Sequence, residues 1–257
     1  MQIKNYFRKS IVLGLGVVVL STFPSCEKFL NQEPKYLLTP EGAVKDQASA
    51  ESILNGAYSF IGKDDYTVRF TGGFSSMLGM VNAVSLAYNF NMNATGDSKT
   101  LWDSFYRTIN GANAVLAAVE PLPESAFKEA ARKNEILGEA RLIRAFASIY
   151  TFWYFGRWWD EPTSPYGIIY RDQLADLANV NQPRISVGDT YTKIIEDLDF
   201  AIANAPEWKT GIRASKQLAQ ALKAKLLLYR GRGDDYQQAL TLVNAVIDRA
   251  PALGLVL

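Results

Sequence analysis

The stretch Ile136-Leu-Gly-Glu-Ala-Arg-Leu-Ile-Arg-Ala-Phe-Ala147 indicates how this chain folds. Its apolar residues recur at spacings of three and four, which is typical of a helix buried along one side. It also contains the small residues Gly138, Ala140, Ala145 and Ala147, and small side chains allow a neighbouring helix to approach closely. We therefore predict a long helix over residues 125–156 that packs tightly against other helices.

The same periodicity continues on both sides of this stretch. Thr39 and Pro40 are residue types that start helices, Ser186 and Asp189 have the spacing of a capping box, and Gly231 is expected to end a helix. No segment shows the regular alternation of a strand. Helix pairs separated by long insertions predict an all-α, tetratricopeptide-like helical-repeat fold (an α-solenoid) with long irregular loops. The further helices are expected over residues 41–61, 101–120, 187–205, 214–230 and 236–249.

The last predicted helix, 236–249, is strongly amphipathic and begins a helix pair whose second member is missing. The apolar tail Ala252-Leu-Gly-Leu-Val-Leu257 follows it, although the end of a helical repeat normally presents a polar face. We expect that the chain is truncated, or that this helix finds its partner in another chain. The apolar faces of the last two helices are expected to include Leu218, Leu222, Leu226 and Tyr229, and then Ala239, Leu240, Val243, Val246 and Ile247.

The composition excludes several kinds of chemistry. The 257 residues include 27 Lys and Arg, 26 Asp and Glu, one cysteine and no histidine. A chain so close to neutrality lacks the concentrated basic face that binds nucleic acid. Without histidine, neither a Ser-His-Asp triad nor the usual zinc sites can form. For an enzyme this composition leaves carboxylate, lysine or tyrosine chemistry, or a metal bound by carboxylates. We identify no cofactor or metal site in the sequence and expect no nucleic-acid partner.

The first 40 residues resemble an export and anchoring signal. A basic start is followed by the apolar stretch 11–20 and then by Cys26, the only cysteine. The apolar stretch is too short to span a bilayer, which needs roughly 20 residues, and has the length of a signal-peptide core. We predict a signal peptide over 1–25, a lipidated N-terminus with an extended tether over 26–40, and a helical-repeat domain over 41–257. A plain signal peptide with an unmodified cysteine, or an uncleaved anchor, is the alternative.

Four stretches carry a resemblance to a known family. They are Cys26–Pro34, Trp102–Asn113, Gly138–Ala147 with Phe155-Gly156, and Tyr191–Ala201 with Arg213–Lys216 and Asp235–Ala239. Together they resemble the SusD/RagB family of outer-membrane nutrient-binding lipoproteins, occur in the family's order and cover nearly all of the chain after Cys26. The resemblance implies a helical scaffold that lies as a lid over a SusC-like TonB-dependent transporter, binds an oligosaccharide or other nutrient, and has no catalytic role. Family members are typically about twice this length, so the match covers an N-terminal half.

Several residues in these stretches are expected to serve the scaffold. Trp102 and Tyr106 lie at helical spacing and are predicted to be core residues, and Asn113 is predicted to bond to backbone. Arg141 and Arg144 are expected to pair with acids such as Glu139 or Asp197, or to cap backbone carbonyls. None of these five positions is expected to contact a ligand.

Two regions offer candidate ligand-binding residues. Trp158, Trp159 and Asp160 follow the long helix, and two adjacent tryptophans on a loop are hard to bury together. Aromatic rings can stack against sugars, while carboxylates and amides bond to hydroxyl groups. Ligand contact, transporter contact and inward packing are the open interpretations of this loop. The second region is the irregular stretch 62–99, where turn chemistry is the alternative; its candidates are Tyr66, Arg69, Tyr88, Asn89, Asn91, Asn93 and Asp97.

We therefore predict a surface-exposed, lipid-anchored outer-membrane protein that binds oligosaccharide or another nutrient and delivers it to a SusC-like transporter. A helical-repeat adaptor that binds a protein partner is the alternative from a different class. A glycoside hydrolase using Asp160 and Glu161 is the weakest candidate, because adjacent carboxylates cannot flank a glycosidic bond at the required roughly 5–9 Å.

Overall fold

The computed structural model describes residues 43–61 and 96–254, all within one compact unit, and every regular element in these ranges is helical. The prediction of an all-α fold is confirmed. Cys26 lies outside the described residues, as do the predicted signal peptide and tether. The elements are α4 (Gln47–Ile61), α6 (Gly96–Val119), the short 3₁₀ helix η4 (Glu124–Ala126), α7 (Ala130–Phe155), α8 (Val187–Asn204), α9 (Lys216–Arg230) and α10 (Asp235–Leu253).

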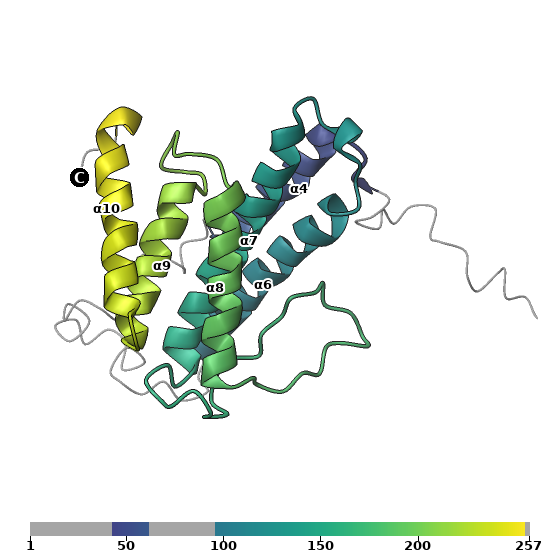
Figure 1. Ribbon diagram of the computed structural model, residues 1–257. Coiled ribbons are helices and arrows are strands. Elements are labelled where there is room, and N and C mark those ends of the chain that lie inside the picture. Colours follow the sequence, from purple (N-terminus) through teal and green to yellow (C-terminus); the bar gives the residue numbers. More distant parts are fainter. Residues whose placement is uncertain (1–42, 62–95, 255–257) are drawn as a thin grey trace, which may run out of the picture. The chain divides into compact units, whose positions relative to one another are not determined.

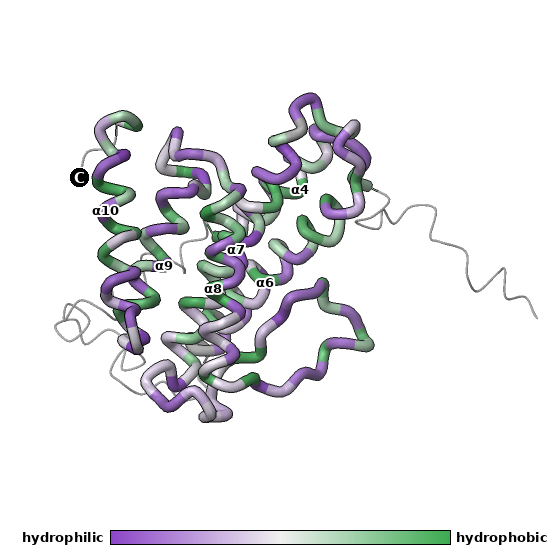
Figure 2. The backbone as a smooth tube through the Cα atoms, viewed as in Figure 1, coloured by the Kyte–Doolittle hydropathy of each residue, from purple (hydrophilic) through white to green (hydrophobic). Residues whose placement is uncertain are grey.

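The helices form a ladder in which each packs against the next along the chain (Figure 1). Helix α7 also contacts α4 and, through a few residues, α9, so it lies at the centre of the unit. Apolar residues recur along the sides on which neighbouring helices meet (Figure 2). This arrangement confirms the tetratricopeptide-like helical-repeat prediction, and the segment 156–186 between α7 and α8 is one of the expected long loops.

Small residues in α7 allow the close packing that its sequence predicts. A Cβ atom on Gly138 would lie 2.5 Å from the backbone nitrogen of Ala205 and 2.9 Å from its Cα. Ala140, Ala145 and Ala147 are fully buried. The backbone at the end of α8 therefore lies directly on α7, at a distance that only a glycine permits.

The first two helix starts differ from the predictions. The first helix begins at Gln47 and not at 41, because Asp46 and Ser49 cap it reciprocally: the Asp46 carboxylate accepts from the Ser49 amide at 2.9 Å, and the Ser49 hydroxyl accepts from the Asp46 amide at 3.1 Å. Thr39, the predicted cap, lies outside the described residues. Helix α6 begins at Gly96, five residues before the predicted 101, and Lys99 and Asp103 form an ion pair one turn apart at 2.6 Å in this added segment.

The bounds of the central and last helices also differ. Helix α7 begins at Ala130 and not at 125, because η4 turns the chain first and buries Phe127 in the core. Helix α10 runs to Leu253 and not to 249, so it includes Pro251, which has no backbone amide to donate. Asp234 makes no capping bond with its side chain; Asp235 instead accepts from the Arg232 amide at 2.8 Å.

Helix α9 begins at Lys216 and not at 214, because the Ser215 hydroxyl caps it by accepting from the Leu218 amide at 3.2 Å. Two predicted end signals, at Ser186 and at Gly231, are confirmed. The Ser186 hydroxyl accepts from the Asp189 amide at 3.0 Å and donates to the Asp189 carboxylate at 2.7 Å. Gly231 closes α9 with φ 58°, in the left-handed region that glycine adopts without strain. A side chain there would also meet the Tyr236 hydroxyl.

Candidate functional site

Four aromatic side chains gather where α7 and α9 end. We call Trp153, Trp158, Trp159 and Tyr229 the aromatic platform. Trp153 stacks on Tyr229 with ring centroids 4.7 Å apart, and Trp158 meets Tyr229 edge-on at 5.1 Å and Trp159 edge-on at 5.4 Å. Trp159 is 63% exposed and Tyr229 is 44% exposed, whereas Trp158 packs against the core. The platform therefore has a partly buried base, formed by Trp153 and Trp158, and two rings that face solvent.

The alternation of helix directions brings these rings together. In a ladder of antiparallel neighbours, α7 and α9 run the same way, so their last turns lie at the same end of the unit (Figure 1). Trp153 is on the last turn of α7 and Tyr229 is on the last turn of α9. Gly156 then ends α7, where a side chain would collide with the Phe152 ring, and the loop turns back toward Tyr229.

Long-range hydrogen bonds hold the backbone on both sides of Trp159. The Tyr191 hydroxyl of α8 donates to the Trp158 carbonyl at 3.0 Å, and the Arg232 guanidinium donates to the Asp160 carbonyl at 2.7 Å. The Arg157 amide donates to the Tyr166 carbonyl at 2.8 Å, with the Arg157 guanidinium 4.1 Å from the centre of the Tyr166 ring. Trp159 thus projects from a loop that is held by two other elements and by a hydrogen bond within the loop itself.

The hydrogen bond from Arg232 to the Asp160 carbonyl depends on a charged pair at the α9–α10 turn. The Asp235 carboxylate binds the Arg230 guanidinium through bonds of 2.6 and 2.8 Å. This hydrogen bonding lowers the pKa of Asp235 below its ordinary value. The turn Arg232-Gly233-Asp234 is therefore a structural link between α9, α10 and the tryptophan loop.

Burial raises the pKa of Tyr191 to about 12, although the nearby Arg232 and Arg230 act in the opposite direction. The phenol therefore remains protonated at neutral pH and keeps its hydrogen bond to the Trp158 carbonyl. The unfolded chain releases this proton near pH 10.

We expect the free energy of unfolding to fall as the pH rises from 10 to 12. Over this interval the folded protein retains the Tyr191 proton while the unfolded chain loses it, so each step in pH favours unfolding. The contribution of this one group is at most about 1.4 kcal/mol per pH unit. Urea unfolding at several pH values would measure the slope, and Tyr191→Phe is expected to make it shallower. Because other buried tyrosines also contribute to the slope, it is expected to become shallower and not to vanish. An unchanged slope in the Tyr191→Phe variant would contradict the assignment.

Polar groups beside the platform could bond to the hydroxyl groups of a ligand. The Asp160 carboxylate accepts from the Ser164 hydroxyl at 2.9 Å and keeps further acceptor capacity. Glu161 is almost fully exposed, with an Arg232 nitrogen 3.9 Å from its carboxylate. The Lys225 ammonium lies 4.9 Å from the centre of the Trp153 ring. The platform thus combines flat apolar rings with donors and acceptors at its edge.

The structure brings together only part of the predicted site. Trp159 is exposed, Trp158 is partly buried and Asp160 lies in the turn between them and Ser164. Asp97 lies in the first turn of α6, away from the loop in sequence, and only its backbone is described. The other candidates of the second region, Tyr66, Arg69, Tyr88, Asn89, Asn91 and Asn93, lie outside the described residues.

Sequence reasoning missed two members of the platform. Tyr229 was predicted on the buried stripe of its helix, and Trp153 was not singled out. Leu218 was also predicted to be buried and is 41% exposed. One signal could have identified Trp153 and Tyr229. Each is an aromatic residue in the last turn of its helix, and the two helices are separated by one helix in the ladder.

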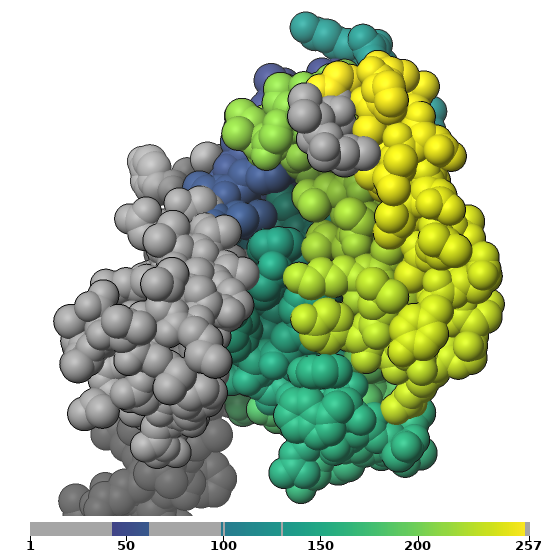
Figure 3. Space-filling view, turned by 90° about the vertical axis from the view of Figure 1, so that its left-hand side faces the viewer, coloured from purple at the N-terminus to yellow at the C-terminus, as the bar shows by residue number. Residues whose placement is uncertain are grey.

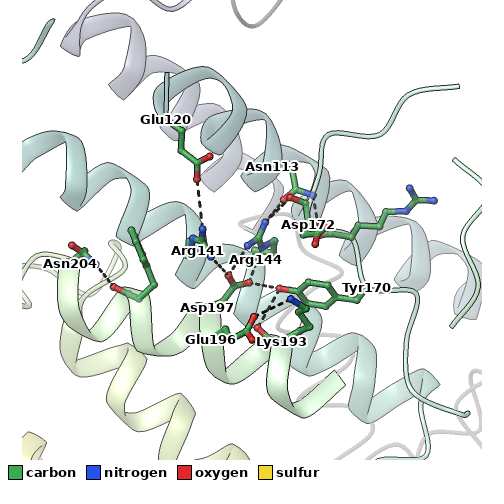
Figure 4. A network of polar contacts seen from close by, with 12 residues as sticks. Asn113, Glu120, Arg141, Arg144, Tyr170, Asp172, Lys193, Glu196, Asp197 and Asn204 are labelled. Atoms are coloured by element: carbon green, nitrogen blue, oxygen red, sulfur yellow. Dashed lines mark hydrogen bonds and ion pairs between the residues drawn. The ribbon is translucent and has the colours of Figure 1, made fainter. Parts of the chain in front are cut away.

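A second polar region lies between α6, α7 and α8 and lines a cavity of about 390 Å³. The Arg144 guanidinium binds the Asp197 carboxylate at 2.6 and 2.7 Å and donates to the Asn113 side-chain oxygen at 2.8 Å (Figure 4). The Tyr170 hydroxyl donates to Asp197 at 2.7 Å, and Arg141 donates to it at 3.2 Å. The Asp197 carboxylate therefore accepts four hydrogen bonds from three side chains.

This network attaches the loop after α7 to the helices. The Asn113 amide donates to the carbonyls of Arg171 and Gln173, at 3.1 and 2.8 Å, and Arg144 donates to the Asp172 carbonyl at 3.1 Å. The predictions for Asn113 and for the pairing of both arginines with Asp197 are confirmed. Because its central charges bind one another, we assign the network to scaffold stability.

Other scaffold predictions are confirmed only in part. Glu139 pairs with Arg132 at 3.0 Å and accepts from the Tyr58 hydroxyl at 2.6 Å, and not from Arg141 or Arg144. Trp102 and Tyr106 are half-buried and not fully buried as predicted. The Tyr106 hydroxyl donates to the Ile169 carbonyl at 3.0 Å, which gives it a structural role.

The described helices define the class of this protein as a tetratricopeptide-like helical-repeat protein. The SusD-like family model described as "Starch-binding associating with outer membrane" matches residues 28–228. The chain belongs to this SusD-like family of outer-membrane-associated carbohydrate-binding proteins. Within 43–61 and 96–254, no helix has both the length and the apolar character to cross a membrane.

Similar proteins agree with the family assignment. A SusD-like protein of Bacteroides ovatus is 33% identical over 87% of this chain and 40% of its own length. SusD-like protein P38 of Formosa agariphila is 27% identical over 94% of this chain and 46% of its own length. The chain thus spans less than half the length of these relatives.

Solved structures share the fold. A SusD superfamily protein from Bacteroides vulgatus has a TM-score of 0.69 at 23% identity, over 82% of this chain and 48% of that one. A laminarin binding SusD-like protein has a TM-score of 0.61 at 22% identity, over 79% of this chain and 43% of that one. The prediction of a SusD/RagB family protein is confirmed.

Proposed function

We propose that this chain is the N-terminal half of a lipid-anchored protein of the outer-membrane surface that binds an oligosaccharide and delivers it to a SusC-like TonB-dependent transporter. The observation that carries the binding part is the exposed ring of Trp159 on a loop held by bonds from α8 and from the α9–α10 turn. Family membership supports carbohydrate as the ligand. The anchor would be Cys26.

The geometry of the platform suits a sugar. The faces of a pyranose ring carry C–H groups, which pack well against an aromatic ring, while its equatorial hydroxyl groups need donors and acceptors at the edge. Trp159 offers the apolar surface, and Asp160, Glu161 and Lys225 lie in or beside the same cluster. A rigid loop lowers the entropy cost of ordering the site when ligand binds.

No bond needs to be made or broken in this proposal. The described residues offer no pair of carboxylates facing each other across the platform, and Asp160 and Glu161 are adjacent in the chain. Release of the sugar to the transporter would then depend on binding equilibria alone. Co-purification of a β-barrel transporter in the absence of sugar would test whether the protein docks on a transporter.

Replacing Trp159 by alanine is expected to weaken glycan binding about tenfold or more, because the stacking surface and its dispersion contacts are lost. The fold is expected to remain intact, since the ring is mostly exposed. Isothermal titration or affinity electrophoresis with a panel of soluble polysaccharides would measure the change.

The matched control is Trp208→Ala, which removes a half-buried tryptophan from the segment before α9, outside the platform. We expect this variant to bind as the unmodified chain does, provided that its thermal unfolding shows it to be folded. Equal binding by the Trp159→Ala variant and the unmodified chain would place the sugar elsewhere. The absence of binding to every glycan would refute the carbohydrate proposal for this half.

A further inference from the structure

A groove lies along α6, separate from the aromatic platform. It has a volume of about 560 Å³ and is lined by α6 and by Phe60 from the last turn of α4. Figure 3 shows the face that α9 and α10 form, and neither of these helices lines the groove. We call it the α6 groove. Its α6 residues include Trp102, Asp103, Tyr106, Arg107, Asn110 and Gly111.

The spacing of its lining residues makes the α6 groove elongated. Every fourth residue from Trp102 to Ala114 lines it, so these side chains follow one line along the helix. At 1.5 Å per residue, this line is roughly 18 Å long. The groove therefore has room for a few sugar rings of an extended chain.

Two other elements meet α6 along this line. The Phe60 ring of α4 lies on Gly111, where an added Cβ atom would come within 2.9 Å of the ring. The loop after α7 is bonded to two side chains of the groove. The Tyr106 hydroxyl donates to a carbonyl of this loop at 3.0 Å, and the Asn110 side-chain oxygen accepts from the Ala175 amide at 2.8 Å. Tyr106 and Asn110 are thus held in place before any ligand binds, which lowers the entropy cost of binding.

One end of the α6 groove is aromatic. The Trp102 and Tyr106 rings have centroids 4.5 Å apart, and the Phe155 ring meets Trp102 edge-on at 5.0 Å. Trp102 and Tyr106 are half-buried and line the groove. They supply a fixed apolar surface of the kind that packs against the C–H groups of a sugar ring.

The polar residues of the α6 groove have unused hydrogen-bonding capacity. Among the described residues, no group accepts from the side-chain amide hydrogens of Asn110. The Asp103 carboxylate binds the Lys99 ammonium through one oxygen at 2.6 Å. Arg107 is exposed, and its guanidinium makes neither an ion pair nor a hydrogen bond within residues 43–61 and 96–254.

The charges of the groove indicate which chemical class it would bind. Lys99 neutralises Asp103, so the charge that no described residue neutralises is the positive charge of Arg107. A guanidinium holds an oxyanion through two parallel N–H bonds, which makes it suited to an acidic substituent. An acidic sugar would present C–H groups to Trp102, hydroxyl oxygens to the Asn110 amide and its oxyanion to Arg107.

We propose that the α6 groove is a second glycan-binding site, which takes a short stretch of an acidic polysaccharide with a carboxylate or sulfate group on Arg107. The choice of carbohydrate rests on the function proposed above, whereas the acidic group follows from the charge of the groove. The proposal gives ligand contacts to Trp102 and Tyr106, which the sequence assigned to the scaffold alone.

The test uses the Trp159→Ala variant, so that the platform contributes little to binding. Isothermal titration is carried out with tetragalacturonate, with a sulfated carrageenan tetrasaccharide and with maltotetraose as the uncharged control. We expect at least one of the two acidic sugars to bind, and maltotetraose to bind about tenfold or more weakly, because it lacks the group that Arg107 holds. The acidic sugar that binds identifies the group as a carboxylate or a sulfate.

Substitutions within the groove assign the binding to it. Arg107→Ala is expected to weaken binding of the acidic sugar about tenfold or more, without loss of the fold, since the side chain is exposed. Asn110→Asp keeps an acceptor for the Ala175 amide but adds a negative charge, and is expected to weaken binding at least as much. The matched control is Arg249→Ala, which removes an exposed arginine of α10 and is expected to leave binding unchanged.

Binding of neither acidic sugar, or equal binding by the Arg107→Ala variant, would overturn the proposal. Equal binding of pentaglutamate would also overturn it, because Arg107 would then recognise an acidic peptide as well as a sugar. The proposed function fails separately. A chain that loses an uncharged glycan on Trp159→Ala substitution, but binds no acidic tetrasaccharide, would keep the platform as its glycan site and lose the second site.

Discussion

Replacing Asp197 by alanine is expected to lower the free energy of unfolding by about 3–5 kcal/mol, the cost of removing one partner of a buried ion pair. The Arg144 side chain is 4% exposed and that of Asp197 is 1% exposed, so water cannot replace the lost carboxylate. The Tyr170 hydroxyl and Arg141 lose the same acceptor. Urea unfolding followed by circular dichroism would measure the change.

Glu196→Ala is the matched control, one residue earlier on the same helix. Glu196 also forms an ion pair, with Lys193 at 3.2 Å, but both side chains are about half exposed. Exposed pairs contribute about 0–1 kcal/mol, so we expect little change. Similar losses in the two variants would mean that burial does not set the strength of this network.

Replacing Gly138 by valine is expected to lower the free energy of unfolding by about 3 kcal/mol, at the upper end of what overpacked cores show. The new Cβ would lie 2.5 Å from the Ala205 nitrogen and 2.9 Å from the Asn204 carbonyl carbon. Both are backbone atoms, so the conflict cannot be relieved by a change of rotamer. The end of α8 would have to move away from α7.

Gly56→Ala is the contrasting substitution for the same measurement. Gly56 lies inside α4 and is exposed, and a Cβ atom added there would meet no other atom within 4 Å. Alanine is favoured over glycine inside a helix by roughly 0.5–1 kcal/mol, so we expect a gain in stability. A loss at Gly56, or none for Gly138→Val, would contradict the packing described for these two glycines.

The helical periodicity of the chain was sufficient to predict all six long helices of the described residues and their pairing in a helical repeat. Their ends were less predictable where a reciprocal cap competed with another start signal, as at Asp46 and Ser49. They were also less predictable where a buried side chain diverted the chain, as at Phe127. A local pattern reports which residues favour a helix, whereas its first residue depends on which donors and carbonyls find partners.

The site was less accessible to sequence reasoning than the fold. Trp158 and Trp159 were predicted as candidates because they follow a helix end, but their sequence positions do not indicate that one is partly buried and the other mostly exposed. Trp159 is exposed because Tyr191 and Arg232, from two other elements, hold its neighbouring carbonyls. Such bonds join positions that are 33 and 72 residues apart.

Apolar spacing, small residues and capping signals act within a few turns of the chain, so they were enough to establish an all-helical repeat. Only the tertiary structure decided that Tyr229 belongs to an exposed platform and that Leu240 and Val243 face outward. Periodicity reveals that a stripe is apolar, but burial depends on whether another element covers it. That depends on the packing of helices distant in the chain.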